Sequence, residues 1–308
     1  GFVYAWYLMA VLLLELWFDY RHDFVIWSKT ATGLKGIIYR VLTLGVTDVS
    51  ENAVRFDARM SRIITAVGIP SAFLLHGYVG FIFGSVKANP WWGTVLMPII
   101  FIFSAIVSGI ALVLFLYIVI CGIRNIALDM PCLETIGKFL FYALVMDAAI
   151  ESLDWIHRFY VSEEYLDVLV LLASGKLFYS FVLFQVCLGT VIPLVLLGLM
   201  QTFRNGTPQM RRDIFFLCSQ LILLGVLAMR WNVVIGGQLF SKSLRGFTTY
   251  KLELIGQEGL FTSLVLLVLP FIILGVLMFF FLPANHMTAG GKPNAAGPTA
   301  NPQTATSL

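Results

Sequence analysis

The chain has 308 residues, of which 59% are hydrophobic and 12% charged, with a formal net charge of +3 and a mean hydropathy of +0.89. Soluble domains carry about 25% charged residues, so this composition predicts an integral membrane protein. The small net charge is spread over scattered loop residues, which excludes a nucleic-acid partner.

The chain opens on GFVYAWYLMAVLLLELWF, which lacks an initiator Met, a positively charged n-region and a small-residue cleavage site. It therefore does not resemble a signal peptide, and it is typical of a membrane helix entered part-way along its length. We expect the natural polypeptide to begin before Gly1.

Seven stretches are candidates for crossing a hydrocarbon core of about 30 Å, which takes about 20 helical residues. They lie at about 2–18, 62–84, 94–121, 134–158, 177–201, 213–235 and 260–282. None alternates between polar and apolar residues as barrel strands do. The predicted fold is an all-α, polytopic transmembrane helix bundle with seven or more spans, N-terminally incomplete, over residues 1–283.

Three segments are not expected to span. Residues 19–61 contain GLKGIIYRVLTLGV, an amphipathic stretch suited to the membrane surface, and residues 163–175 are too short and too acidic at their start. Residues 284–308 are rich in Pro, Gly, Ala, Thr and Asn, which predicts a low-complexity tail without a fold of its own.

The distribution of Lys and Arg predicts the orientation. The more basic segments, assigned to the cytoplasm, are 19–61, 122–133, 202–212 and the tail. The less basic loops, assigned to the outside, are 85–93, 159–176 and 236–259. We expect a multi-pass protein of the cytoplasmic (inner) membrane with a cytoplasmic C-terminal tail.

The stretch LVMDAAIESLDWIHR, residues 144–158, places several charges inside a predicted span. On a helix, Asp147, Glu151, Asp154 and Arg158 fall within an arc of about 60°. A charge at mid-bilayer costs at least about 2.5–3.5 kcal/mol, so this stripe should face the bundle interior or water. An ordinary salt-bridged helix end accounts for Asp154 and Arg158, whereas the deeper Asp147 and Glu151 favour a function.

Further polar residues lie at the same predicted depth, in the outer half of the membrane. His76 occurs in IPSAFLLHGYVGFIFG, and Arg230 and Asn232 occur in LAMRWNVVIGGQ. A lone histidine within a span is more often a hydrogen-bonded packing residue than a ligand. The carboxylates and the arginine at the same depth favour a functional role for His76.

A quinone head group suits such a layer, because its two carbonyl oxygens accept hydrogen bonds and protons on reduction. It needs donors such as His or Asn and a carboxylate that leads protons to water. Trp91 and Trp92 in NPWWG could pack against the ring, although an interfacial aromatic belt is the alternative interpretation.

Other cofactors are not predicted. The four cysteines fall singly, without a CxxC pair, so no iron–sulfur cluster or metal site is expected: Cys121, Cys132, Cys187 and Cys218. Of the four histidines only His76 lies firmly within a span, which argues against haem. The sequence also has no Walker motif, nucleophile elbow or HExxH.

Two stretches carry a family resemblance: HGYVGFIFGSVKANPWWGTVLMPIIFIFSAIVSGIAL, from His76, and MRWNVVIGGQ, from Met229. They resemble the NrfD or polysulfide reductase C family of membrane proteins, and most closely its DsrP branch, which belongs to the DsrMKJOP complex. The resemblance implies a haem-free bundle with more helices than the seven visible here, binding menaquinone or ubiquinone in its outer half. It also implies a periplasmic partner with ferredoxin-like iron–sulfur clusters, alongside multihaem cytochrome c and other membrane redox subunits.

The resulting hypothesis is a quinone-interacting subunit of a respiratory complex, in sulfur or sulfite metabolism. In it His76 hydrogen-bonds the head group, with Trp91 and Trp92 nearby, while Arg230 and Asn232 hold the site. The residues assigned to proton transfer are Asp147, Glu151 and Asp154. Two alternatives stay open: a proton- or ion-translocating subunit using the same stripe, and a purely structural membrane anchor.

Overall fold

The computed structural model describes residues 2–89, 91–161, 166–203, 206–239, 254 and 259–281. These residues form helices joined by short loops, and none of them is in a strand. The chain divides into two compact units, Gly1–Lys251 and Leu252–Leu308. The predicted tail, residues 284–308, lies outside the described residues.

Five helices in the described part of the chain are long and apolar enough to cross a membrane. In the first unit these are α4 (Glu51–Gly84), α5 (Met97–Arg124), the continuous helix of η2 (Phe178–Val191) and α8 (Ile192–Thr202), and α9 (Pro208–Gln238). In the second unit the span Leu260–Phe279 lies within α10 (Leu260–Phe281). They correspond to five of the seven predicted spans, and the protein is a multi-pass membrane helix bundle.

The remaining two predicted spans are also helical, but both carry more charge. Helix α6 covers Met130–Val161 and includes the charged stripe, as described below. The N-terminal helix runs without a break through α1 (Phe2–Ala5), η1 (Trp6–Leu12) and α2 (Leu13–Thr30), well past the predicted end at residue 18. The segments expected at the surface contain the short helices α3 (Gly33–Leu42) and α7 (Leu166–Ser174).

Helix α2 extends beyond the predicted end at residue 18, and α4 begins before the predicted start at residue 62. Both differences have one cause, because the polar halves of the two helices pair with each other. Arg21, which is 2% exposed, donates from Nε at 2.8 Å and from Nη2 at 2.5 Å to Asp57 Oδ2. Glu15 and Asp19 on α2 accept hydrogen bonds from Thr65 and Ser61 on α4. A prediction from hydropathy places the end of a span at its first charged residues. Here the charged residues of each helix pair with polar side chains of the other, so both helices continue beyond that point.

The turn before α4 is also well defined. Ser50 is the N-cap of α4 and its Oγ accepts a hydrogen bond from the Ala53 backbone N–H, at 3.3 Å. The Ser50 backbone N–H donates to Asp48 Oδ1 at 2.8 Å, and this hydrogen bond lowers the pKa of the Asp48 carboxyl. The entry into α4 is thus fixed by local hydrogen bonds.

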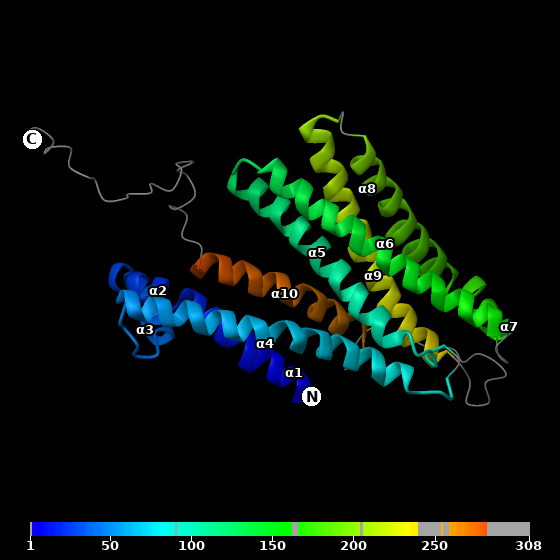
Figure 1. Ribbon diagram of the computed structural model, residues 1–308, viewed down its shortest axis with the longest axis horizontal. Coiled ribbons are helices and arrows are strands. Elements are labelled where there is room, and N and C mark those ends of the chain that lie inside the picture. The colour runs from blue at the N-terminus through cyan, green and yellow to red at the C-terminus, as the bar shows by residue number, and fades with distance from the viewer. Residues whose placement is uncertain are drawn as a thin grey trace, which may run out of the picture. The chain divides into compact units, whose positions relative to one another are not determined.

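Helices α5, α6, α8 and α9 surround the main apolar core, and the C-terminal part of α4 meets the start of α5, where Gly80 lies against Pro98 (Figure 1). On α6 the core positions Leu133, Leu140 and Leu144 repeat at helical spacing, so one face of the helix is buried. Helices η2 and α9 cross closely at two glycines, because a Cβ on Gly189 would collide with the Cα of Gly225. Small residues permit this approach, as is common between membrane helices.

Candidate functional site

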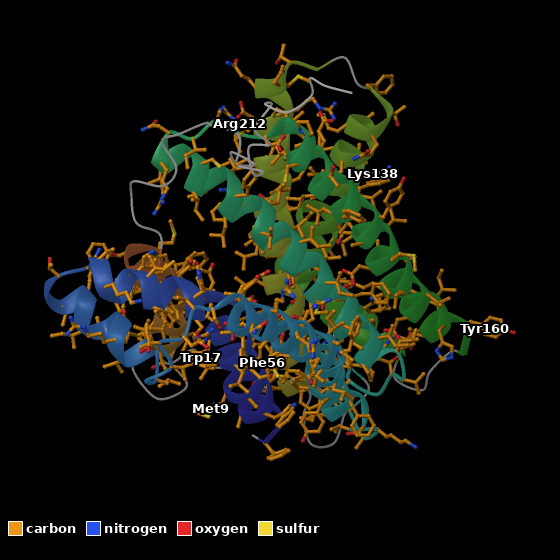
Figure 2. The ribbon with its side chains drawn as sticks, turned by 60° about the vertical axis from the view of Figure 1, so that its left-hand side comes forward. Met9, Trp17, Phe56, Lys138, Tyr160 and Arg212 are labelled. Carbon is orange, nitrogen blue, oxygen red and sulfur yellow. The ribbon has the colours of Figure 1, made fainter. Side chains whose placement is uncertain are left out.

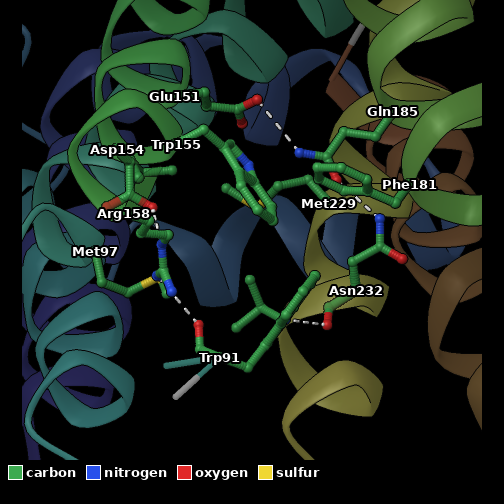
Figure 3. Close-up of a pocket in the computed structure, with 12 residues that line it drawn as sticks. Trp91, Met97, Glu151, Asp154, Trp155, Arg158, Phe181, Gln185, Met229 and Asn232 are labelled. Atoms are coloured by element: carbon green, nitrogen blue, oxygen red, sulfur yellow. Dashed lines mark hydrogen bonds and ion pairs between the residues drawn. The ribbon is translucent and has the colours of Figure 1, made fainter. Parts of the chain in front are cut away.

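A pocket with about 520 Å³ of empty space, its open side included, lies among α5, α6, η2, α9 and the loop that precedes α5 (Figure 3). Its walls are mostly aromatic and aliphatic, with five polar side chains. The lining residues are Trp91, Met97, Ile100, Glu151, Asp154, Trp155, Arg158, Phe181, Gln185, Met229, Asn232 and Val233.

The charged stripe of α6 continues the buried face of that helix into this pocket. Asp147, Asp154 and Arg158 are 7%, 6% and 4% exposed, so the stripe faces the bundle and not the surroundings. Arg158 Nε donates to Asp154 Oδ2 at 3.0 Å, and Thr94 Oγ1 donates to Asp154 Oδ1. Asp154 is thus held by a cation and a hydroxyl group, which ties α6 to the loop before α5.

Glu151 belongs to a different set of contacts. Asn232 Nδ2 on α9 donates to Gln185 Oε1 on η2 at 2.8 Å, and Gln185 Nε2 donates to Glu151 Oε2 at 3.3 Å (Figure 3). Three helices therefore meet through one chain of side-chain hydrogen bonds. Asn232 is 2% exposed, and its Oδ1 is buried without a hydrogen-bond partner among the described residues. A buried acceptor of this kind suits a ligand or water that can donate.

Gln185 reaches this position from a π-helical stretch, η2. Such stretches are rare and often occur at functional sites. The Gln185 backbone carbonyl accepts a hydrogen bond from Thr190 Oγ1 at 3.1 Å. The same stretch presents Phe181 to the pocket, where its ring centroid lies 5.3 Å from that of Trp155.

The two tryptophans of NPWWG are docked onto the end of α9. Trp91 Nε1 donates to the Asn232 backbone carbonyl at 2.8 Å, and Trp92 Nε1 donates to the Val233 carbonyl at 2.5 Å. Trp91 is 8% exposed and lines the pocket, whereas Trp92 packs edge-on against Phe83. The structure therefore favours an internal role for both indoles over a lipid-facing aromatic belt.

Glycines make this docking possible. A Cβ on Gly236 would lie 2.6 Å from Trp91 Nε1, and one on Gly237 would collide with the indole of Trp92. Asn89 adds a hydrogen bond from Nδ2 to the Gly237 carbonyl at 2.8 Å. The two stretches that carried the family resemblance are thus in direct contact, with the indoles of one seated on the glycines of the other.

His76 lies in a second pocket, lined by parts of α1, α4, α5 and α9. Arg230 lines it too and donates from Nη2 to Ser104 Oγ at 2.8 Å and to the Phe101 carbonyl at 3.2 Å. Its guanidinium also lies over the Phe101 ring, 3.9 Å from the centroid. Helix α5 therefore lies between the His76 pocket and the pocket that contains Glu151.

The predicted site residues are therefore divided. Trp91, Glu151, Asp154 and Asn232 line the first pocket, and His76 and Arg230 line the second. Asp147 and Trp92 line neither of these two.

Arg230 links the two groups. It interacts electrostatically with Asp147 and Glu151 on one side and with His76 on the other. Asp147 Oδ1 is buried without a hydrogen-bond partner among the described residues.

Sequence reasoning missed Gln185, Trp155 and Phe181, and it assigned Arg158 to an ordinary helix end. Gln185 was open to detection, because it is the only strongly polar side chain in the apolar run FVLFQVCLG. The aromatic residues gave no such signal, since Trp and Phe are common throughout membrane spans.

An apolar groove with about 1440 Å³ of empty space adjoins the first pocket. It runs along α6, α7, η2 and α8, and it shares Glu151, Trp155 and Phe181 with the pocket. Most of its other lining residues are aliphatic, including Val182, Val186, Leu194 and Val195. The first pocket and the apolar groove thus share part of their walls.

A family model described as "Polysulphide reductase, NrfD" matches residues 1–242, more than three quarters of the chain. The chain belongs to the NrfD family. Among curated proteins, this NrfD-family chain is 30% identical over 234 residues to a subunit of the selenate reductase of Mesobacillus selenatarsenatis. The match covers 74% of this chain and 52% of that protein, so the chain spans about half the length of its relative.

Membership of the NrfD family bears out the family resemblance, without assigning a branch. No group of three or more His, Cys, Asp and Glu able to hold a metal ion occurs among the described residues of this NrfD-family chain.

Proposed function

We propose that this NrfD-family chain is the quinol-interacting membrane subunit of a respiratory oxidoreductase complex. It exchanges electrons between menaquinol or ubiquinol and an iron–sulfur partner subunit. The observation that carries the proposal is the pocket in which Glu151, Gln185 and Asn232 join three helices beside three aromatic rings. This combination provides an enclosure of aromatic surface with polar groups in its wall, the two kinds of contact that a quinone ring requires.

The unsatisfied oxygen of Asn232 supports this fit. A quinol has two hydroxyl groups that donate hydrogen bonds, and the buried Asn232 Oδ1 lacks a donor among the described residues. Trp91, Trp155 and Phe181 give the pocket apolar aromatic surface. We place the head group here, with Asn232 and Gln185 orienting it.

The adjoining groove suits the isoprenoid tail. It begins at Trp155 and Phe181, which also line the head-group pocket, and continues over aliphatic residues of η2 and α8. A tail in this groove stays in the hydrocarbon layer while the head group reaches the polar residues. The groove also provides a route by which quinol enters from the membrane.

Quinol oxidation yields two electrons and two protons, and the chain's own residues handle the protons. Glu151 lines both the pocket and the groove, and it accepts a long hydrogen bond from Gln185. It is therefore placed to take a proton from the site. Asp154 is already paired with Arg158 and Thr94, so we assign it to positioning, while Asp147 continues the stripe deeper into the bundle.

The electron acceptor is proposed from the resemblance and from the orientation. The pocket lies toward the end of the bundle that holds the loop before α5, which the Lys and Arg distribution assigns to the periplasm. A periplasmic subunit with ferredoxin-like clusters would dock there, in a DsrMKJOP-like assembly with multihaem cytochrome c and other membrane subunits. The relative from the selenate reductase and the DsrP resemblance both point to respiration of sulfur or selenium compounds.

A second function, proton translocation, is favoured by the stripe on α6. Asp147 Oδ1 is buried without a hydrogen-bond partner among the described residues, and Glu151 lies one helical turn further along the same helix. In that case the subunit would translocate protons alongside quinol oxidation. Proton release measured in intact vesicles distinguishes the two, because a non-translocating subunit releases two protons per quinol and a translocating one releases more.

The test is photo-crosslinking of the complex, purified in mild detergent, with an azido-quinone, followed by peptide mapping. We expect label on α6, η2 and α9, together with menaquinone or ubiquinone in the lipid extract. Label confined to α4 and the His76 side of α5 would move the head group to the second pocket. The proposal would be rejected if no peptide were labelled, no quinone were extracted and activity were unchanged after replacement of the buried carboxylates. The chain would then be a purely structural membrane anchor.

A further inference from the structure

A separate polar pocket lies at the opposite end of the bundle from the Trp91 loop. It has about 940 Å³ of empty space, its open side included, and is formed by α6, α8 and α9. Five of its seven lining residues are polar: Pro131, Glu134, Thr135, Lys138, Met200, Gln201 and Arg211. Lys138 and Arg212, the neighbour of Arg211, lie toward the same end of the bundle (Figure 2).

Arg211 is a buried cation in the wall of this pocket. The residue is 8% exposed, and its Nη1 donates a long hydrogen bond of 3.4 Å to the Met200 carbonyl. Its Nε forms an ion pair with Glu134 Oε1 at 2.9 Å, although the N–H is not aligned with that oxygen for a hydrogen bond. An anion oxygen in the pocket would give the guanidinium an aligned acceptor, and hydrogen bonds between charged groups are the stronger ones.

The surrounding charge also favours an anion. Lys138 is exposed and makes no ion pair among the described residues, so two cations face the single carboxylate of Glu134. The first turns of α6 and α9 both border the pocket, and helix N-termini carry partial positive charge. Gln201 adds an amide group at the end of α8.

We propose that this pocket binds the phosphate group of an anionic phospholipid, with Arg211 and Lys138 as its cationic contacts. Phe139 and Leu199, the chain neighbours of Lys138 and Met200, are 64% and 47% exposed and provide apolar surface for acyl chains. The Lys and Arg distribution assigns this end to the cytoplasmic leaflet, where basic pockets between helices bind anionic head groups. The lipid would join α6, α8 and α9 at the end away from the quinol pocket.

The experiment uses the full chain, purified from membranes in mild detergent with its copurifying subunits. Bound phospholipids are extracted, quantified per chain and compared with the bulk membrane. We expect enrichment of an anionic class, and about a fivefold loss of affinity for phosphatidylglycerol nanodiscs in Lys138→Gln. Lys138→Glu should weaken binding further.

The matched control is Lys87→Gln, which removes an exposed lysine at the opposite end of the bundle. Equal loss in both variants, or no anionic enrichment in the unaltered protein, would overturn the proposal. An acidic segment of a partner subunit seated on Lys138 in the purified complex would also overturn it. A titration of delipidated protein with inorganic phosphate separates the two sources, since Lys138-dependent phosphate binding without lipid enrichment would keep the anion site and reject the lipid.

Discussion

Replacing Glu151 by Gln tests the quinol pocket with little change of shape. The side chain keeps its length, and its amide oxygen can still accept the hydrogen bond that Gln185 Nε2 donates at 3.3 Å. Trp91, Trp155 and Phe181 still enclose the pocket. The variant therefore removes the capacity to carry a proton and leaves the binding surface in place.

The size of the expected loss in kcat depends on whether another carboxylate can take the proton in place of Glu151. Asp154 is held by Arg158 Nε at 3.0 Å and by Thr94 Oγ1, and Asp147 does not line the pocket. A positioned acid or base contributes about 10²- to 10⁴-fold to a rate. We expect kcat for quinol oxidation to fall by at least about 100-fold, at the lower end of that range, while KM changes little.

The assay is steady-state quinol oxidation by the assembled complex in membranes, with an artificial acceptor for the iron–sulfur partner. Glu51→Gln is the control, because its side chain is 80% exposed in an ion pair with Arg55, away from the pocket. His76→Gln is the informative comparison, since His76 lines the other pocket. Normal turnover in Glu151→Gln together with a large loss in His76→Gln would refute the placement of the head group beside Glu151.

Three further predictions concern the groove and the packing of the bundle. Val182→Phe should narrow the apolar groove, raising KM for long-tailed quinols but not for a short-tailed analogue, and an equal effect on both would contradict a tail in the groove. Gly237→Ala should lower the free energy of unfolding in detergent by about 2–4 kcal/mol, because the added Cβ collides with Trp92 and displaces its hydrogen bond to Val233. Gly109→Ala is the control and should be nearly neutral, because a Cβ there faces open space. Arg21→Met should cost about 3–5 kcal/mol by leaving Asp57 buried and unpaired, and the double variant with Asp57→Leu should recover most of that loss in the same measurement; no recovery would show that the packing of Arg21 matters more than its charge.

The helices and the charged face of α6 could be predicted from the sequence because both depend on local periodicity. Asp147, Glu151, Asp154 and Arg158 repeat at helical spacing, and the cost of charge in hydrocarbon points them inward. The length of α2 could not be predicted in this way. Its polar half is stabilised by Asp57 of α4, a contact that no single-segment pattern contains.

The division of the polar residues between two pockets could not be predicted from the sequence either. Depth follows from position along a span, so His76, Arg230 and Glu151 were predicted to share a level. Which helices lie between them depends on packing, and α5 turned out to lie between His76 and Glu151. Contacts between glycines determine much of that packing, including the close approach of Gly189 and Gly225. The composition of the chain does not show which glycines will meet.

The docking of the Trp91 loop on α9 joins the NPWWG and IGGQ stretches into one structural unit. Trp91 is held by the backbone carbonyl of Asn232, while the Asn232 side chain holds Gln185 and thereby Glu151. The position of the loop at the surface and the position of the carboxylate inside the bundle therefore depend on the same residue. In the proposed function, a partner subunit that docks on this loop would act directly on the geometry of the quinol pocket and would thereby couple electron acceptance at the surface to proton handling within the bundle.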